Sequence, residues 1–348
     1  MVRPKVSVII PVYLVSAYVE RCVRSVMEQS YTDIECIIVD DETDDDSIEK
    51  CEALISKYGG PILFRILHHE QNRGLSAARN TGTAAATGDY LYYLDSDDYI
   101  APDCIERLVS VVDKDPTIEM VQGNCIIESV GKASPLGKVK QPVCISNNDE
   151  ARTAFYNDRN IYISVWNRLL KKSFVEKYDL YCREGLVCED LLWVFYLIKH
   201  LNKAYLCEEV TYHYMLRSGS ILTNNKPESM RAYTVIFDEI FHNLTVEREQ
   251  EEIKGFLWYF IKRYVSYVKK VPEFKDTIRL YKSKAWQFHC SKVYIALSIT
   301  IIMGQLGNPK GVLEWLNALR WKWKMAEGRS LMCDIVKTVR TKLGLEKQ

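Results

Sequence analysis

Three aspartates within four positions follow a short apolar run in the segment Tyr93-Leu94-Asp95-Ser96-Asp97-Asp98. The run begins at Tyr90, directly after a Gly88-Asp89 turn signal, and this pattern predicts a buried strand. Carboxylates crowded at the end of a buried strand repel one another unless a positive charge lies between them. A hard divalent cation supplies that charge and usually binds phosphate as well. A solvated turn is the alternative, because Asp and Ser favour turns.

Two earlier strand-like runs also end in residues that could bind a ligand. The first run contains Pro11 and is followed by Tyr13, and the second ends at Asp40-Asp41. Because ligands bind outside the carboxyl ends of parallel strands, we expect these residues to converge with the aspartate segment. Tyr13 could stack on a flat nucleobase, and the Asp41 carboxylate could accept a hydrogen bond from a base N–H.

The pair Glu189-Asp190 supplies a candidate general base. A metal at Asp95 and Asp97 would stabilise the charge that builds on a leaving diphosphate. Such a reaction also needs a base to deprotonate the attacking hydroxyl. Acidic residues at the start of a helix often serve only as caps, and the pair precedes the helical run Leu191–Phe195. If a nucleotide–metal site lies nearby, catalysis becomes the favoured interpretation of the Glu189-Asp190 pair.

Strand-like and helix-like patterns alternate through the first half of the chain. Apolar runs predict strands over residues 6–12, 34–39, 62–67, 90–94 and 120–127. Helical spacing of apolar residues predicts helices over residues 17–29, 47–57, 76–87, 102–112, 149–157 and 189–200. This alternation implies right-handed βαβ units and a mostly parallel sheet. We expect residues 128–150 to be rich in loops, and the chain to be predominantly helical from about residue 229.

Several other site classes lack their motifs. No G-x-G-x-x-G follows the first strand, and no P-loop, G-x-S-x-G or His-x-x-x-His pattern occurs. The 11 cysteines have neither zinc-site nor disulfide-framework spacing. We expect His68-His69 to be a surface pair rather than a metal site. The start, Met1–Lys5, has no signal-peptide pattern, so we expect a reducing cytoplasm with buried free thiols.

The net charge of zero conceals two regions of opposite sign. Residues 1–249 carry 27 Lys and Arg against 38 Asp and Glu, whereas residues 250–348 carry 19 against 8. The basic region is also aromatic, as in Trp321-Lys322-Trp323-Lys324, which suits an anionic membrane surface. Its longest apolar run, Val293–Met303, is too short to span a bilayer. A helical subdomain with a solvated basic face is the alternative, and we expect no nucleic-acid partner.

Seven ordered stretches resemble glycosyltransferase family 2, the inverting GT-A enzymes that use nucleotide-diphosphate sugars. The stretches are residues 6–13, 25–31, 37–41, 72–82, 88–98, 189–192 and 212–221. The resemblance therefore extends over residues 6–221 and does not cover the chain beyond about residue 230.

The resemblance implies a set of donor-binding residues. Pro11, Tyr13 and Asp41 would hold the nucleobase and ribose. Arg79 would contact the nucleotide side of the pocket. Arg217 would steady the diphosphate from a closing loop. The donor would be a nucleotide-diphosphate sugar, with UDP favoured because most resembling enzymes use it.

The resemblance also implies a metal site and a base. Asp95 and Asp97 would form the DxD pair for Mn²⁺ or Mg²⁺, with Asp97 as the direct ligand. Asp98 would share in donor binding. Asp190 would deprotonate the acceptor hydroxyl for in-line attack on the anomeric carbon.

Two positions depart from the family pattern. The family usually has Asn after the Tyr, where this chain has Leu14, and Asp-Asp-Gly-Ser where this chain has Asp41-Glu42-Thr43. Glu42 lacks the freedom of Gly at positive φ, so we expect that turn to be built differently.

These observations predict an α/β protein with a GT-A, Rossmann-like sheet flanked by helices over residues 1–228. A basic, aromatic-rich helical region would follow over residues 229–348. We expect an inverting glycosyltransferase that acts on a glycan or lipid-linked acceptor in the synthesis of polysaccharide, lipopolysaccharide or capsule. It would lie peripherally on the inner face of the cell membrane. The alternatives are a metal-dependent nucleotidyltransferase and a catalytically degenerate GT-A scaffold.

Overall fold

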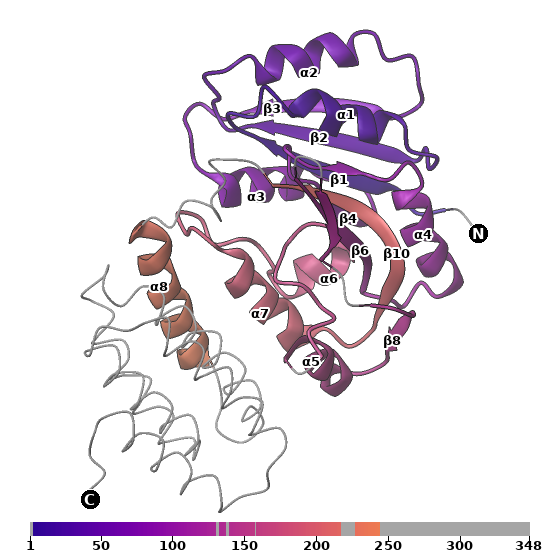
Figure 1. The fold of residues 1–348 in the computed structure, drawn as a ribbon, viewed down its shortest axis with the longest axis vertical. Coiled ribbons are helices and arrows are strands. Elements are labelled where there is room, and N and C mark those ends of the chain that lie inside the picture. The colour runs from indigo at the N-terminus through magenta and orange to yellow at the C-terminus, as the bar shows by residue number, and fades with distance from the viewer. Residues whose placement is uncertain (1–2, 130–131, 137–138, 157, 217–226, 244–348) are drawn as a thin grey trace, which may run out of the picture. The chain divides into compact units, whose positions relative to one another are not determined.

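The computed structural model describes residues 3–129, 132–136, 139–156, 158–216 and 227–243 (Figure 1). The chain divides into two compact units, residues 1–236 and 237–348. The first unit contains the sheet and its helices. Of the second unit, only residues 237–243 are described. Residues 229–243, the first part of the predicted C-terminal region, form a helix, whereas the basic, aromatic residues 250–348 lie outside the described residues.

The helices and strands have the following bounds. The strands are β1 (Val6–Val12), β2 (Ile34–Asp40), β3 (Leu63–His68), β4 (Tyr90–Tyr93), β5 (Tyr99–Ile100), β6 (Met120–Ser129), β7 (Lys132–Pro135), β8 (Val143–Ile145), β9 (Arg168–Lys171) and β10 (Ala204–Met215). The helices are α1 (Val19–Met27), α2 (Ser47–Ile55), α3 (Leu75–Ala85), α4 (Cys104–Lys114), α5 (Asn148–Tyr156), α6 (Lys172–Lys177), α7 (Asp190–His200) and α8 (Pro227–Asn243).

The described strands form one sheet, in the order β3-β2-β1-β4-β9-β6-β10-β5, with β7 paired to β6 and β8 to β10. Strands β3, β2, β1 and β4 are mutually parallel, as predicted. Strand β9 runs antiparallel to both of its neighbours, β4 and β6, so the sheet as a whole is mixed. The parallel part places the carboxyl ends of β1, β2 and β4 along one edge.

The central strand β1 is buried along its whole length, which explains its continuous apolar sequence. Helices α1 and α2 pack together on one face of this part of the sheet, and α3 covers the other (Figure 1). Gly82 lets α3 approach β1 closely, because a Cβ at this position would overlap the Ile9 side chain. Helix α3 is therefore held against the strands that end at the site.

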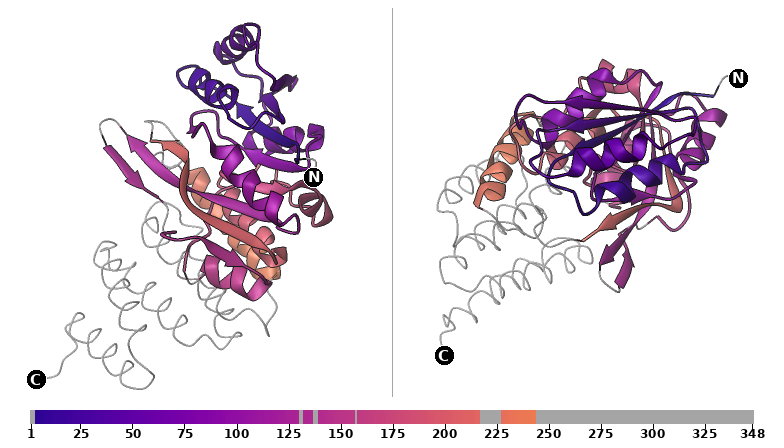
Figure 2. Two further views of the ribbon diagram at one scale, coloured as in Figure 1. Left: turned by 90° about the vertical axis from the view of Figure 1, so that its right-hand side faces the viewer. Right: turned by 90° about the horizontal axis from the view of Figure 1, so that it is seen from above.

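The stretch expected to be rich in loops contains two short strands. Strands β7 and β8 lie within residues 128–150, and the long β6 continues to Ser129. In the views of Figure 2, β6 and β7 extend from the body of the sheet as a hairpin. Strand β7 is exposed throughout, so it lacks the apolar alternation from which strands are predicted.

Candidate active site

Pairing between β1 and β2 places two of the predicted donor-binding residues side by side. Val12 is registered with Asp40, and the Asp41 amide donates to the Val12 carbonyl at 3.0 Å. Tyr13, one residue beyond β1, is 42% exposed, so its ring is available to a flat ligand. Pro11 lies inside β1 opposite Val39 and is buried. It therefore shapes the strand end from within.

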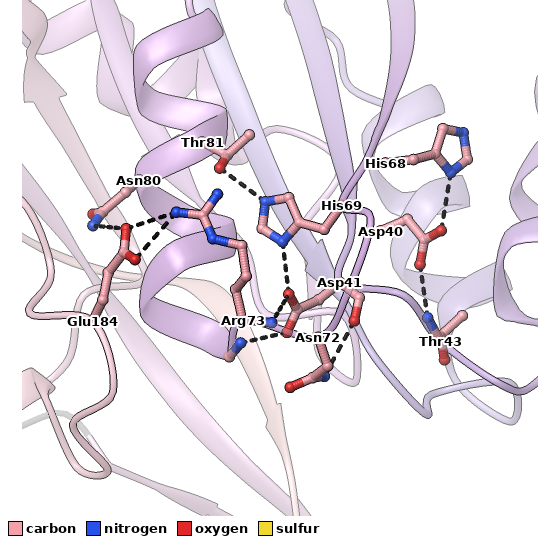
Figure 3. Close-up of polar contacts among 11 residues, drawn as sticks. Asp40, Asp41, Thr43, His68, His69, Asn72, Arg73, Asn80, Thr81 and Glu184 are labelled. Atoms are coloured by element: carbon pink, nitrogen blue, oxygen red, sulfur yellow. Dashed lines mark hydrogen bonds and ion pairs between the residues drawn. The ribbon is translucent and has the colours of Figure 1, made fainter.

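The Asp41 carboxylate is buried and serves as a hub of hydrogen bonds (Figure 3). Its Oδ1 accepts from the amide of Arg73 at 2.8 Å, and its Oδ2 accepts from the amide of Gly74 at 2.7 Å. His69 Nδ1 lies 2.7 Å from Oδ1. These contacts fix the loop that leads into α3, and they occupy most of the acceptor positions through which Asp41 was predicted to hold a base.

The two adjacent histidines have different surroundings. His68 is exposed and its Nδ1 lies 2.9 Å from Asp40 Oδ2, whereas His69 is buried between Asp41 and Thr81. The prediction of a surface pair is therefore wrong for His69. His68 is the last residue of β3, whereas His69 lies just beyond it, where its amide donates to the Asp40 carbonyl at 2.9 Å and its ring is held by Asp41 and Thr81.

The three aspartates after β4 lie in three different environments. Asp98 is buried and accepts hydrogen bonds from the Tyr212 hydroxyl and the Met215 amide, each at 2.7 Å. Burial, together with the charges of Asp97 and Asp95, raises the pKa of Asp98 well above its usual range. Asp98 therefore anchors β10 to the aspartate turn rather than facing an open pocket.

Asp95 and Asp97 remain as the partly exposed carboxylates of this turn. The Asp95 side chain is 21% exposed, and its Oδ1 lies 2.7 Å from Arg79 Nη2. The Asp97 carbonyl accepts from Arg21 Nη2 at 3.2 Å.

A metal ion at this turn would have few protein ligands. In the described part of the chain, no group of three or more His, Cys, Asp or Glu side chains could hold a metal ion. Magnesium-like cations are often bound by only one or two carboxylates together with substrate phosphates. The hard oxygen donors of Asp95 and Asp97 fit such a shared cation.

Arg79 links the aspartate turn to the predicted base. Its buried guanidinium lies 2.7 Å from Asp95, 2.5 Å from Glu189 and 3.5 Å from Asp190. Burial alone would lower the pKa of Arg79, but the three carboxylates outweigh it and raise the pKa well above its ordinary value. The sequence predicted a contact on the nucleotide side. The structure places this side chain behind the carboxylates, where only 1% of it is exposed.

Asp190 is the more accessible member of the pair at the start of α7. Its side chain is 30% exposed, whereas that of Glu189 is 7% exposed. Burial and the Glu189 charge raise the pKa of Asp190 to about 7, although Arg79 opposes the rise. A base is most effective when its pKa is near the working pH, so Asp190 has the properties that its predicted role requires.

Two further residues were given no role in the sequence analysis, Arg168 beside Asp190 and Tyr212 beside Asp98. Arg168 is fully buried and donates to the carbonyl of Tyr162 at 2.5 Å and to Gln122 Oε1. Burial lowers its pKa to about 10, and Asp190 partly offsets this effect. Tyr212 donates to Asp98 and stacks on Trp166 with ring centroids 4.5 Å apart. Arg168 belongs to none of the stretches that resemble the family, whereas Tyr212 begins the stretch 212–221, in which it was given no role of its own. Arg217 lies outside the described residues.

Comparison with known proteins gives a consistent result. Residues 7–177 match the family model for glycosyl transferase family 2. The glycosyltransferase YibD of Escherichia coli is 25% identical over 279 residues, which are 79% of this chain and 76% of YibD. The glycosyltransferase GlyA of Streptococcus pneumoniae is 31% identical over 238 residues, which are 64% of this chain. The match spans about a third of the length of GlyA, 32%.

A solved structure shares the fold. TarS residues 1–349 of S. aureus, in complex with UDP-GlcNAc, superpose with a TM-score of 0.68 and 19% sequence identity. The superposition covers 89% of this chain and 90% of that chain. The predicted GT-A class of α/β fold is therefore confirmed.

Proposed function

We propose that this chain, which belongs to glycosyl transferase family 2 through its residues 7–177, is an inverting transferase that uses a nucleoside-diphosphate sugar. It is a glycosyltransferase. The donor class, the stereochemistry and the acceptor are our proposal. The observation that carries it is the position of Arg79, which contacts Asp95 on the donor side and Asp190 on the acceptor side.

The donor would lie along the carboxyl edge of β1, β2 and β4. Tyr13 would stack on the base, while Pro11 and Asp41 would shape the base and ribose pocket. A divalent cation, Mn²⁺ or Mg²⁺, bound to Asp97 and Asp95 would neutralise the leaving diphosphate when present. UDP is the favoured nucleotide, because TarS, which shares the fold, was solved with UDP-GlcNAc.

Asp190 would remove the proton from the acceptor hydroxyl as the oxygen attacks the anomeric carbon. The nucleoside diphosphate would then leave from the opposite face, so a single displacement inverts the configuration. Arg79 would hold Asp95 and Asp190 at a fixed separation while both carboxylates are charged. A carboxylate near pKa 7 is partly deprotonated at neutral pH and still accepts a proton readily.

The acceptor would be a glycan or lipid-linked saccharide in cell-surface polysaccharide, lipopolysaccharide or capsule synthesis at the inner face of the membrane. The basic, aromatic region over residues 250–348 supports attachment to an anionic membrane surface. No helix among the described residues is long and apolar enough to cross a bilayer.

The decisive experiment is a transfer assay on the full chain with UDP-, GDP-, TDP- and CMP-sugars, with and without Mn²⁺. We expect transfer from one sugar nucleotide to be lost in Asp190→Asn while binding of UDP is kept. Asp97→Ala should weaken metal-dependent UDP binding. Asp149→Asn, at an exposed position in α5, is the control and should match the parent. Full transfer by both site variants would rule the proposal out.

A further inference from the structure

The segment that carries the base is not held by regular secondary structure. Residues 178–189, between α6 and α7, form neither helix nor strand. Asp179, Gly185 and Cys188 in this segment have φ values of 52°, 72° and 61°. Left-handed conformations are unfavourable for residues other than Gly, so contacts from elsewhere must maintain this path.

Asn80, on α3, provides one such contact. Its Nδ2 donates to the Cys182 carbonyl at 2.8 Å, and its Oδ1 accepts from the Cys182 amide at 2.8 Å. A side-chain amide offers a donor and an acceptor at once, so it can satisfy both backbone groups of one residue as a neighbouring strand would. Cys182 is thereby tied to the face of α3.

Arg73, in the loop before α3, provides a second contact (Figure 3). Its Nη2 lies 3.1 Å and 3.2 Å from the two carboxylate oxygens of Glu184. Asn80 Nδ2 also lies 3.5 Å from Glu184. The Arg73 backbone amide donates to the buried Asp41 carboxylate, which fixes the backbone position from which the Arg73 side chain extends.

We propose that Asn80 and the Arg73–Glu184 pair are positioning residues, which hold the base segment on α3 so that Asp190 faces the donor. Consecutive residues of α3 hold the segment at two points, since Asn80 binds Cys182 while Arg79 binds Glu189 and Asp190. Helix α3 is itself fixed to the donor pocket through Asp41. This inference rests on the proposed function in assigning Asp190 as the base.

The test compares two Asn→Asp variants of the full chain. Asn80→Asp keeps the size of the side chain but places an oxygen against the Cys182 carbonyl. Displacing a catalytic group by about 1 Å can cost about 100-fold, so we expect kcat to fall by about 10- to 100-fold. The affinity for UDP with Mn²⁺, measured by calorimetry, should stay within about twofold of the parent, because Asn80 does not form the donor pocket.

Asn148→Asp is the matched control. Asn148 Nδ2 donates to the carbonyls of Ile198 and Leu201 at 2.8 Å each, so this variant also opposes a carboxylate to backbone oxygens. It should lower the melting temperature without changing kcat. If Asn80→Asp and Asn148→Asp lower the melting temperature by the same amount and also lower kcat by the same factor, the proposal is overturned.

Charge exchange tests the second contact. Exposed ion pairs contribute little, so Arg73→Glu alone should lower kcat only about twofold to fivefold. The double variant Arg73→Glu with Glu184→Arg should recover most of that loss. No recovery would show that the pair does not position the segment.

Hydrogen exchange separates this proposal from the proposed function. Asn80→Asp should accelerate amide exchange across residues 180–190 about tenfold or more, whatever reaction the protein catalyses. If the parent chain transfers no sugar but exchange is faster in Asn80→Asp, the proposed function fails, whereas the proposal that Asn80 holds the segment stands. Unchanged exchange across residues 180–190 in Asn80→Asp would overturn the proposal that Asn80 holds this segment, even if the parent chain is an active transferase.

Discussion

A single guanidinium makes the ion pairs of the site. Arg79 is surrounded by three carboxylates, from Asp95, Glu189 and Asp190, and is almost completely buried. The charges of Arg79 and Arg168 only partly oppose burial and the neighbouring carboxylates, so the pKa of Asp190 is raised to about 7. The most exposed of them is Asp190, the residue that we propose as the base.

We therefore expect transferase activity to depend on the ionisation of Asp190. Because its pKa is raised to about 7, kcat/KM should rise with pH, about tenfold per unit below this value, and level off above it. A rate profile between pH 5.5 and 8.5 checks this, with a correction for metal binding from UDP titrations at each pH.

The residual rate of Asp190→Asn serves as the control and should not vary over the same pH range. A parent rate profile that does not change slope near pH 7 would contradict the assignment of Asp190 as the base.

The raised pKa of Asp190 also affects the stability of the fold. An acid whose folded pKa lies above its usual 3.8 stabilises the fold only while protonated, so this contribution is lost as pH rises from about 4 to 7.

At the scale of elements, the turns after β1 and β2 share an unfavourable backbone conformation. Leu14 and Glu42 each lie two residues beyond the ends of registered strands, with φ values of 51° and 57°. The family pattern has Asn and Gly at these positions. Glu42 nevertheless adopts the positive φ that Gly would allow without strain. The Thr43 hydroxyl, which accepts from the Leu14 amide at 2.8 Å, ties the two turns together.

Relief of this strain should stabilise the protein. A left-handed residue with a Cβ costs about 1–2 kcal/mol, and the greater freedom of Gly in the unfolded chain offsets part of the gain. We expect Glu42→Gly to raise the free energy of unfolding by about 0.5–1 kcal/mol in urea titrations followed by tryptophan fluorescence.

The exposed helical residue Glu49 offers a matched control. Glu49→Gly makes the same chemical change within α2, where it should instead destabilise by about 1 kcal/mol. Equal effects of the two substitutions would show that the turn is not strained.

At the scale of the whole molecule, the charge asymmetry suggests that one part of the chain carries the site and another part binds a membrane surface. The acidic part of the chain contains the site, whereas residues 250–348 carry 19 Lys and Arg against 8 Asp and Glu. An acidic surface is repelled by anionic lipid, so a basic region would be needed to bring the site to a membrane-bound acceptor.

We expect the full chain to sediment with vesicles containing phosphatidylglycerol at low salt and to be released at about 0.5 M salt, where screening is strong. Vesicles of phosphatidylcholine alone should bind much less. Lys322→Glu with Lys324→Glu should weaken binding to the anionic vesicles. Identical sedimentation with both lipids would argue against surface attachment.

Local sequence patterns predicted the elements that carry the site. Strand β1 occupies the predicted residues 6–12, and the helices that follow β1, β2 and β3 begin within two residues of their predicted starts. These segments repeat apolar residues with the period of their own structure, so their neighbours in the chain are sufficient to identify them. The antiparallel strand β9 escaped prediction, because only four residues form it and its pairing partners are distant.

The sequence by itself determined the fold class, the three strand ends and the residue types that can do the chemistry. Only the tertiary structure decided which carboxylates are buried, which pair with a cationic side chain and which remain accessible. Asp95, Asp97 and Asp98 are neighbours in sequence, yet Asp98 is locked by Tyr212, 114 positions away, and Asp95 by Arg79. Burial and charge pairing depend on such distant partners, because electrostatic interactions follow distance in space rather than separation along the chain.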